Sequence, residues 1–149
     1  MKSSTFKLVK NLYPPYWATG ISVKTVSRDY RFVRVEMKKR WYNQNYVKTH
    51  FGGSLYAMVD PFFMLMLIPI LGKEYVVWDQ AASIDFIKPG MGTVSAEFLI
   101  TDAMIKDILE KTSQGEKYLP QYPVEILDND GGVVAMVTKK LYIRKKRAS

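Results

Sequence analysis

Residues 55–71 read LYAMVDPFFMLMLIPIL, an apolar run interrupted only by Asp60, Pro61 and Pro69. Its 17 residues fall short of the roughly 20 that span a bilayer. A central aspartate also costs roughly 2.5–3.5 kcal/mol on insertion into a membrane. A helix that is apolar on all sides is equally what the core of a domain requires. We therefore expect a buried core helix that ends at Gly72, and no membrane span.

Strand-like segments flank this run on both sides. Alternating apolar and polar side chains predict six strands, over 21–27, 32–40, 75–88, 93–101, 122–127 and 133–143. Two further helices are expected, over 6–12 before Pro14-Pro15 and over about 102–111 with Asp102 as its cap. This order predicts the α+β class, in which an antiparallel sheet curls around the apolar helix. One edge of such a sheet is left free to pair with another copy of the chain.

The composition excludes several kinds of site. With 149 residues, 48% of them apolar, the chain suits one domain with a buried core. The absence of cysteine excludes disulfides, thiolate-bound metals and a thiol nucleophile. The only histidine, His50, excludes a site with several histidine ligands, so we expect neither a metal nor another cofactor. We treat residues 1–149 as one domain, with an N-terminal helical segment at 1–20 and a basic tail at 144–149.

The net charge of +8 favours an anionic partner, such as a nucleotide-bearing thioester, RNA or an acidic membrane surface. Nucleic-acid binding would require a broad basic face with interleaved aromatic side chains, and we expect no nucleic-acid partner. The N-terminal residues MKSSTFKLVKNLYPPYW lack the apolar core of a signal peptide. We therefore expect a cytoplasmic protein.

The start of the apolar run has the residue types that a carbonyl-processing site needs. Gly52 and Gly53 allow a ligand to approach the backbone closely, and the free N–H groups at a helix start suit a developing oxyanion. Asp60 follows Gly53 by seven residues, about two helical turns. Its apolar neighbours should desolvate it, raise its pKa and make it a better general base.

Each of these residues also has a structural interpretation. Asp60 before Pro61 is a helix-start signal, in which the carboxylate caps backbone N–H groups of the next turn. Gly52 and Gly53 also suit a plain loop, and His50 suits a loop histidine with one backbone hydrogen bond. The local residues leave both interpretations open.

The segment HFGGSLYAMVD, residues 50–60, resembles the helix-start motif of the hotdog-fold thioesterases, especially the PaaI-like type. In that motif His-Gly-Gly precedes a helix, and an aspartate lies seven residues after the second glycine. Gly53 and Asp60 match this spacing. Phe51 stands where the motif has its histidine, and His50 comes one residue earlier.

A second stretch, YVVWDQAASIDFIKPGMGTVSAEF at residues 75–98, resembles the two strands that follow the central helix in that fold. The likeness extends over about residues 6–144. It is nearest to an uncharacterised branch of the superfamily, the domain of unknown function 4442.

The resemblance implies a hotdog fold and a homodimer, or a dimer of dimers, with active sites between protomers. The strand over 77–87 would pair across the twofold axis. Asp60 would be the general base or nucleophile on an acyl thioester, most simply of coenzyme A, and the Gly53 N–H would hold the carbonyl oxygen. His50 would share that role only if it reaches the site.

Further candidates surround these catalytic positions. Asp79 suits either a solvent-facing or dimer-edge position or a second polar group in the cleft. The candidates for substrate contact are Gly52, Ser54, Tyr56, Trp78 and Lys88. The alternative function is a non-catalytic hotdog domain that binds an acyl chain, an acyl-coenzyme A or another hydrophobic metabolite. A binder of nucleic acid or membrane surfaces is the weakest of the three hypotheses.

Overall fold

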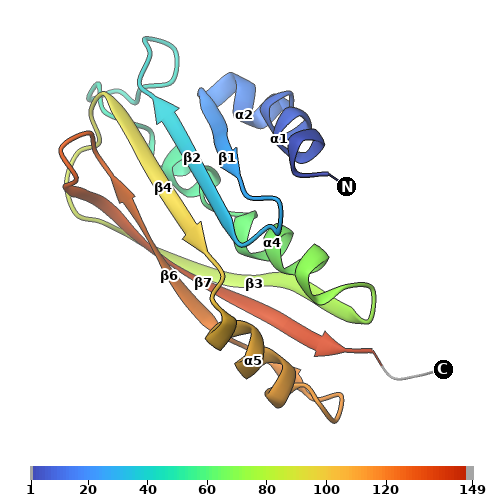
Figure 1. The fold of residues 1–149 in the computed structure, drawn as a ribbon. Coiled ribbons are helices and arrows are strands. Elements are labelled where there is room, and N and C mark those ends of the chain that lie inside the picture. The colour runs from blue at the N-terminus through green and yellow to red at the C-terminus, as the bar shows by residue number, and fades with distance from the viewer. Residues whose placement is uncertain (1, 147–149) are drawn as a thin grey trace.

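The computed structural model describes residues 2–146, which form five helices and seven strands (Figure 1). The helices are α1 (Ser3–Asn11), α2 (Pro14–Thr19), α3 (Gly52–Ala57), α4 (Phe62–Leu71) and α5 (Asp102–Lys111). The strands are β1 (Ile21–Val26), β2 (Phe32–Lys38), β3 (Tyr75–Phe86), β4 (Thr93–Leu99), β5 (Lys117–Tyr118), β6 (Gln121–Leu127) and β7 (Val133–Lys145). One antiparallel sheet has the order β1-β2-β4-β6-β7-β3, and β5 pairs with β7.

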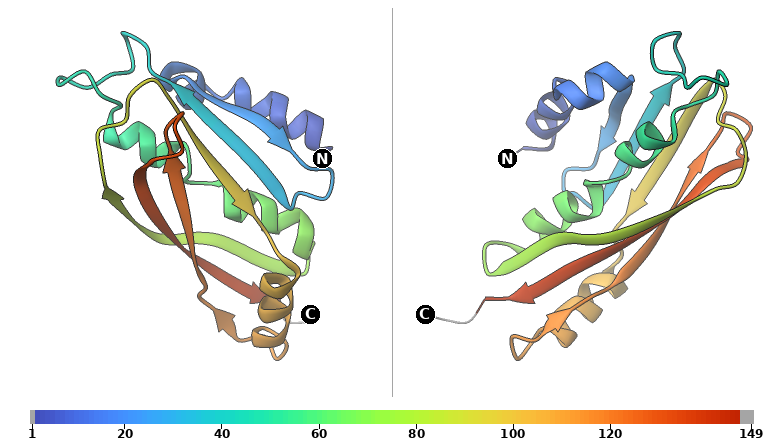
Figure 2. Two further views of the ribbon diagram at one scale, coloured as in Figure 1. Left: turned by 60° about the vertical axis from the view of Figure 1, so that its left-hand side comes forward. Right: turned by 180° about the vertical axis from the view of Figure 1, so that it is seen from behind.

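The sheet bends around α3 and α4, which lie along its concave side (Figure 2). The predicted alternation in β2 is confirmed, because Val33, Val35 and Met37 are fully buried. From the helix side, the Phe62 ring of α4 lies 5.0 Å from the Phe98 ring of β4. The apolar segment is therefore a core element of an α+β hotdog fold, as the sequence predicted.

The apolar run is interrupted rather than continuous. α3 ends at Ala57, a turn covers residues 58–61, and α4 begins at Phe62. Pro61 has no N–H to donate to the preceding turn, which explains why the helix breaks there. Asp60 is not the N-cap of α4, since Pro61 holds that position and no side chain caps the helix. The capping interpretation of Asp60 is therefore wrong.

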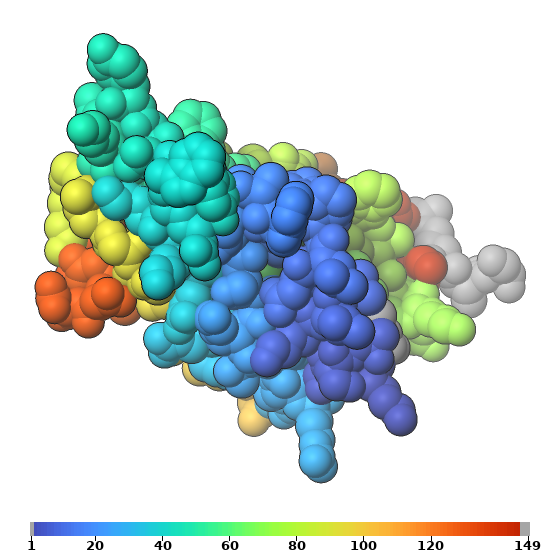
Figure 3. Space-filling view, turned by 90° about the horizontal axis from the view of Figure 1, so that it is seen from above, coloured from blue at the N-terminus to red at the C-terminus, as the bar shows by residue number. Residues whose placement is uncertain are grey.

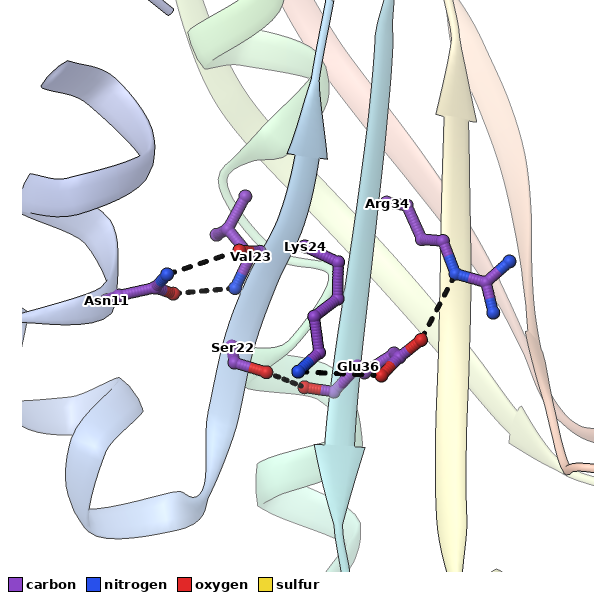
Figure 4. Close-up of polar contacts among 6 residues, drawn as sticks. All are labelled: Asn11, Ser22, Val23, Lys24, Arg34 and Glu36. Carbon is purple, nitrogen blue, oxygen red and sulfur yellow. Dashed lines mark hydrogen bonds and ion pairs between the residues drawn. The ribbon is translucent and has the colours of Figure 1, made fainter. Parts of the chain in front are cut away.

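The two edges of the sheet differ. At the β1 edge, the side-chain amide of Asn11 accepts from the N–H of Val23 at 2.7 Å and donates to its carbonyl oxygen at 3.2 Å (Figure 4). This contact ties α1 to the backbone of the edge strand. At the other edge β3 pairs only with β7 among the described strands. The free edge expected from the sequence is therefore β3.

Several boundaries differ from the sequence predictions. The two prolines 14 and 15 end the first helix but also begin α2, because proline is compatible with the first helical turn. Thr101, and not Asp102, caps α5, since its hydroxyl accepts from the N–H of Met104 at 3.2 Å. The short strand β5 was not predicted.

The predicted basic tail begins inside the sheet. β7 ends at Lys145, so Arg144 and Lys145 belong to that strand. Residues 147–149 of the tail lie outside the described residues.

Replacing Phe98 by alanine should lower the free energy of unfolding by about 3–5 kcal/mol, because its ring packs against Phe62 and Phe63 in the closed core. Replacing its exposed neighbour Leu99 by alanine should change it by only about 0.5 kcal/mol. Urea unfolding followed by circular dichroism measures both. Equal losses would contradict the assignment of the helix–sheet core.

Candidate functional site

Asp60 lies at the break between α3 and α4 and forms two polar contacts there. Lys139 of β7 donates from Nζ to Asp60 Oδ1 at 2.7 Å, and the Tyr56 hydroxyl donates to the same oxygen. Lys139 Nζ also lies 3.1 Å from Tyr56 Oη. Tyr56 and Asp60 are four residues apart, the spacing that places two side chains on one face of a helix. The break therefore presents a carboxylate and a phenol together to the sheet.

A second carboxylate reaches the same lysine from the edge strand. Asp79 of β3 has its Oδ1 3.2 Å from Lys139 Nζ. The Lys139 side chain is only 1% exposed, whereas that of Asp60 is 44% exposed. We call these four residues, Tyr56, Asp60, Asp79 and Lys139, the Asp60 cluster. Its cation is sealed inside the fold, and its Asp60 carboxylate is still reached by solvent.

The charges in the Asp60 cluster stabilise one another. Burial opposes the charge on Lys139, but its hydrogen bonds to Asp60 and Tyr56 and the nearby carboxylates raise its pKa above the ordinary value. Burial also acts to raise the pKa of Asp60, yet the bonds from Lys139 and Tyr56 outweigh it and the pKa falls. Burial raises the pKa of Asp79, which Lys139 offsets only in part. Asp60 is therefore ionised and Asp79 is the weaker acid.

The expectation of a raised pKa for Asp60 is wrong. It took account of the apolar neighbours in sequence and missed Lys139, 79 residues away. A signal for Lys139 does exist in the sequence, because it alternates in β7 with Val137 and Leu141, both fully buried. A lysine on such a face is almost never fully buried without a partner.

His50 lies in a different place. His50 is buried. Its Nε2–H donates to the carbonyl oxygen of Gly92 at 3.0 Å, and its backbone N–H donates to the carbonyl oxygen of Gly90, also at 3.0 Å. Burial lowers the pKa of His50, so the ring is neutral near pH 7. None of these contacts involves Asp60. The structure thus agrees with the interpretation of a loop histidine whose side chain makes one backbone hydrogen bond.

His50 lines a cavity of about 400 Å³ between the loop before α3 and the end of β3. Gly52 and Lys88 line the same cavity. Lys88 also forms an ion pair with Asp128 at 2.5 Å, so its charge is already partnered. Three of the predicted site residues therefore meet here, apart from the Asp60 cluster.

The two glycines face aromatic rings of the chain itself. A Cβ on Gly52 would lie 2.9 Å from the Phe86 ring, and one on Gly53 would lie 2.5 Å from the Phe51 ring. Both residues belong to α3, so they do not form a plain loop. Ser54 is buried, and its N–H donates to the carbonyl oxygen of Phe51 at 2.9 Å. The absence of side chains at the glycines is thus explained by internal packing.

Two candidates for substrate contact remain, Tyr56 and Trp78. Tyr56 belongs to the Asp60 cluster, whereas Trp78 projects from β3 with an exposed side chain and contributes to neither place. Among residues 2–146, no group of three or more His, Asp or Glu side chains is arranged to hold a metal ion.

A family model described as a domain of unknown function (DUF4442) matches residues 2–143. The chain belongs to the DUF4442 family. No curated protein matches this DUF4442 chain. The family and the fold named from the helix-start motif are therefore confirmed.

Solved structures share the fold of this DUF4442 chain at low sequence identity. A protein of unknown function from Pseudomonas aeruginosa, described as a probable thioesterase, superposes with a TM-score of 0.83 at 15% identity, over 97% of each chain. A thioesterase from Haemophilus influenzae gives 0.69 at 10% identity, over 97% of this chain and 92% of its own. The PaaI protein of the E. coli phenylacetic acid degradation operon gives 0.62 at 21%, over 93% of each chain. At these identities the likeness establishes the fold alone.

Replacing Lys139 by methionine should raise the pKa of Asp60, because burial would then act without an opposing cation. The side-chain carboxyl signals of aspartate, followed by ¹³C NMR against pH, measure this directly. Lys140→Met is the matched control, since Lys140 is the next residue of β7 and does not belong to the cluster. An unchanged pKa of Asp60 in Lys139→Met would contradict the conclusion that Lys139 lowers this pKa.

The lowered pKa of Asp60 also fixes the sign of a pH effect on stability. A carboxyl with a lower pKa in the folded state contributes stability above its unfolded pKa and loses it as the pH falls through the folded value. The free energy of unfolding should therefore fall as the pH drops below the ordinary pKa range of aspartate. The slope of the free energy of unfolding against pH should be smaller in Lys139→Met than in Lys140→Met. Urea titrations at a series of acidic pH values measure the slopes. Identical slopes would contradict the assignment.

Proposed function

We propose that this chain hydrolyses an acyl thioester and that Asp60 acts on the thioester carbonyl. The observation that supports this most is the state of the Asp60 carboxylate. It is ionised and fixed by Lys139 and Tyr56, yet 44% of its side chain is exposed. A group that reacts with a substrate needs both a defined orientation and access. The solved hotdog structures described as thioesterases add to this proposal by analogy.

Two routes are open to this carboxylate. As a nucleophile, an Asp60 oxygen bonds to the carbonyl carbon, the C–S bond breaks, and the thiolate takes a proton from water. Water then cleaves the resulting anhydride and releases the acid. As a general base, Asp60 takes a proton from a water whose oxygen attacks the same carbon. The C–S bond then breaks, and Asp60 returns that proton to the leaving thiolate. A general base works best with a pKa near the working pH, so the lowered pKa favours the nucleophilic route.

The carbonyl oxygen would be held by the backbone N–H of Gly53. The first N–H groups of a helix have no partner within it and are available for a developing negative charge. His50 would support this position indirectly, because its hydrogen bond to Gly92 holds the chain beside the start of α3. Gly52, Ser54 and Tyr56 would complete the surroundings of the acyl group.

We propose coenzyme A as the thiol partner because it is the simplest thiol carrier that the resemblance to the hotdog-fold thioesterases implies. Lys88 and Trp78 are the proposed contacts to that carrier. Both side chains are exposed, but Lys88 lies two residues beyond the end of β3, whereas Trp78 lies near the start of that strand. The proposed compartment is the cytoplasm.

We further propose a homodimer that pairs the free β3 edges over residues 77–87. Phe86 and Ile87 are exposed large apolar side chains at the end of this strand. An exposed, long edge with apolar side chains is a template for pairing with another chain. Pairing two copies would also bring a second protomer beside Asp79, which lies on the same strand.

One observation favours the non-catalytic alternative. Lys139 already neutralises Asp60 inside the fold, and buried ion pairs also occur as purely structural elements. In that case the domain would bind an acyl chain, an acyl-coenzyme A or another hydrophobic metabolite without turnover. The first of the following experiments separates the two functions.

Asp60→Asn should reduce thiol release from a reactive acyl-coenzyme A by about 10²–10⁴-fold, because the amide neither attacks carbon nor accepts a proton. The assay follows free thiol over a panel of short, long and aromatic acyl groups. Asp79→Asn is the matched control, since it also removes a carboxylate beside Lys139 and should retain most of the activity. Wild-type protein that binds the panel without releasing thiol would support the alternative.

Sedimentation velocity should give a mass of about twice the 17.2 kDa of the chain, or a multiple of that dimer. Ala82→Lys should shift the protein toward the monomer, because two like charges would face each other near the twofold axis. Ser22→Lys on the opposite edge strand, β1, is the control and should leave the mass unchanged. A monomeric wild type would refute the pairing.

A further inference from the structure

The positive charge of the chain is concentrated in two segments. Residues 1–28 and 37–59 contain nine Lys and Arg and no Asp or Glu. The rest of the chain has 13 basic and 14 acidic residues, so it is close to neutral. The whole excess of +8 therefore comes from these two segments.

The two segments lie together in space. The first forms α1, α2 and β1, and the second begins at the end of β2 and continues through the loop to α3. Asn43 in that loop donates from its buried amide to the carbonyl oxygens of Thr19 at 2.8 Å and Lys38 at 2.9 Å. Figure 3 shows the loop and the two N-terminal helices side by side on one face of the molecule.

Large aromatic side chains are exposed on this face. Trp17 is 77% exposed and Trp41 is 84% exposed, and the Trp41 ring packs edge-on against Tyr42 at 5.5 Å. Two adjoining hollows of about 400 and 310 Å³ share Trp17 and Tyr42 as lining residues. We define the basic aromatic face by these three rings and the cations that line the larger hollow: Trp17, Lys24, Lys38, Arg40, Trp41 and Tyr42.

The cations of this face are largely unneutralised. Lys24 has one distant ion pair, with Glu36 at 3.7 Å (Figure 4). Within residues 2–146, Lys38 and Arg40 have no carboxylate within ion-pair distance. No acidic residue lines the larger hollow. The basic aromatic face therefore attracts anions, and its exposed rings can contact an apolar environment next to those anions.

We propose that the basic aromatic face docks the protein onto a membrane surface that carries anionic phospholipids. Trp and Tyr side chains favour the boundary between lipid headgroups and acyl chains, and clustered Lys and Arg are drawn to anionic headgroups. The same two basic segments also expose the aliphatic side chains of Leu12 and Val47. A bilayer boundary accommodates aliphatic and aromatic side chains alike, whereas nucleic-acid bases stack only on the rings. This mixture favours lipid over nucleic acid, and the docking is independent of the proposed hydrolysis.

The three tryptophans of the chain allow a direct test. Trp17 and Trp41 belong to the basic aromatic face, whereas Trp78 lies on β3, outside it. The Trp78→Phe variant should show a blue-shifted emission when mixed with vesicles of phosphatidylcholine and phosphatidylglycerol. It should show no shift with phosphatidylcholine alone, and added salt should weaken the effect because it screens the charges. The double variant Trp17→Phe/Trp41→Phe, which retains Trp78, should show no shift.

A charge variant tests the cations separately. Lys38→Gln/Arg40→Gln should weaken vesicle affinity by about thirty-fold, measured by vesicle co-sedimentation. Lys106→Gln/Lys117→Gln is the matched control, because it removes two charges from α5 and β5 and should leave the affinity unchanged.

Four outcomes would overturn the proposal. The first is no binding to the anionic vesicles, and the second is an equal spectral shift of Trp78. The third is tighter binding of a duplex or single-stranded oligonucleotide than of vesicles, with loss of that binding in Lys38→Gln/Arg40→Gln. The fourth is a change of oligomeric state in Trp17→Phe/Trp41→Phe, which would show that a second copy covers this face.

Discussion

The structure depends on the placement of one ammonium group inside an apolar wall. Lys139 occupies an inward position of β7, where its charge is removed from water and has to meet an anion. The break after α3 supplies Asp60, and the edge strand β3 supplies Asp79. Removing the inward lysine would leave both carboxylates without their shared cation. The interruption of the core helix is thus linked to the sheet that surrounds it.

This constraint also determines what the candidate site is able to do. An isolated aspartate among apolar side chains would hold its proton more tightly, whereas contact with Lys139 and Tyr56 keeps Asp60 ionised. The lysine that makes the carboxylate available also lowers its basicity. Orientation and charge therefore support attack on a carbonyl carbon better than proton abstraction. The non-catalytic alternative rests on the same Lys139–Asp60 ion pair, which it treats as a purely structural element.

The molecule divides its charge by region. The neutral part of the chain forms most of the sheet, the three charged residues of the Asp60 cluster and the free edge, while the basic segments gather at α1, α2 and the loop before α3. Asn11 ties α1 to the β1 edge, so that side of the sheet does not resemble the free edge at β3. The proposed self-association and the proposed contact with an anionic surface thus involve different parts of the protein.

The sequence by itself determined the fold class, the inward faces of the strands and the special position of Asp60, because periodicity, helix breakers and a short motif are local signals. Only the tertiary structure decided how Asp60 is charged. Its partner lies 79 residues along the chain, and no local pattern specifies which acid a buried lysine will meet. The separation of His50 from Asp60, and the neighbourhood of Trp17 and Tyr42, likewise depend on how the loop packs against other elements. Pairings of this kind are set by the closing of the sheet around its core, which brings together residues that the sequence keeps apart.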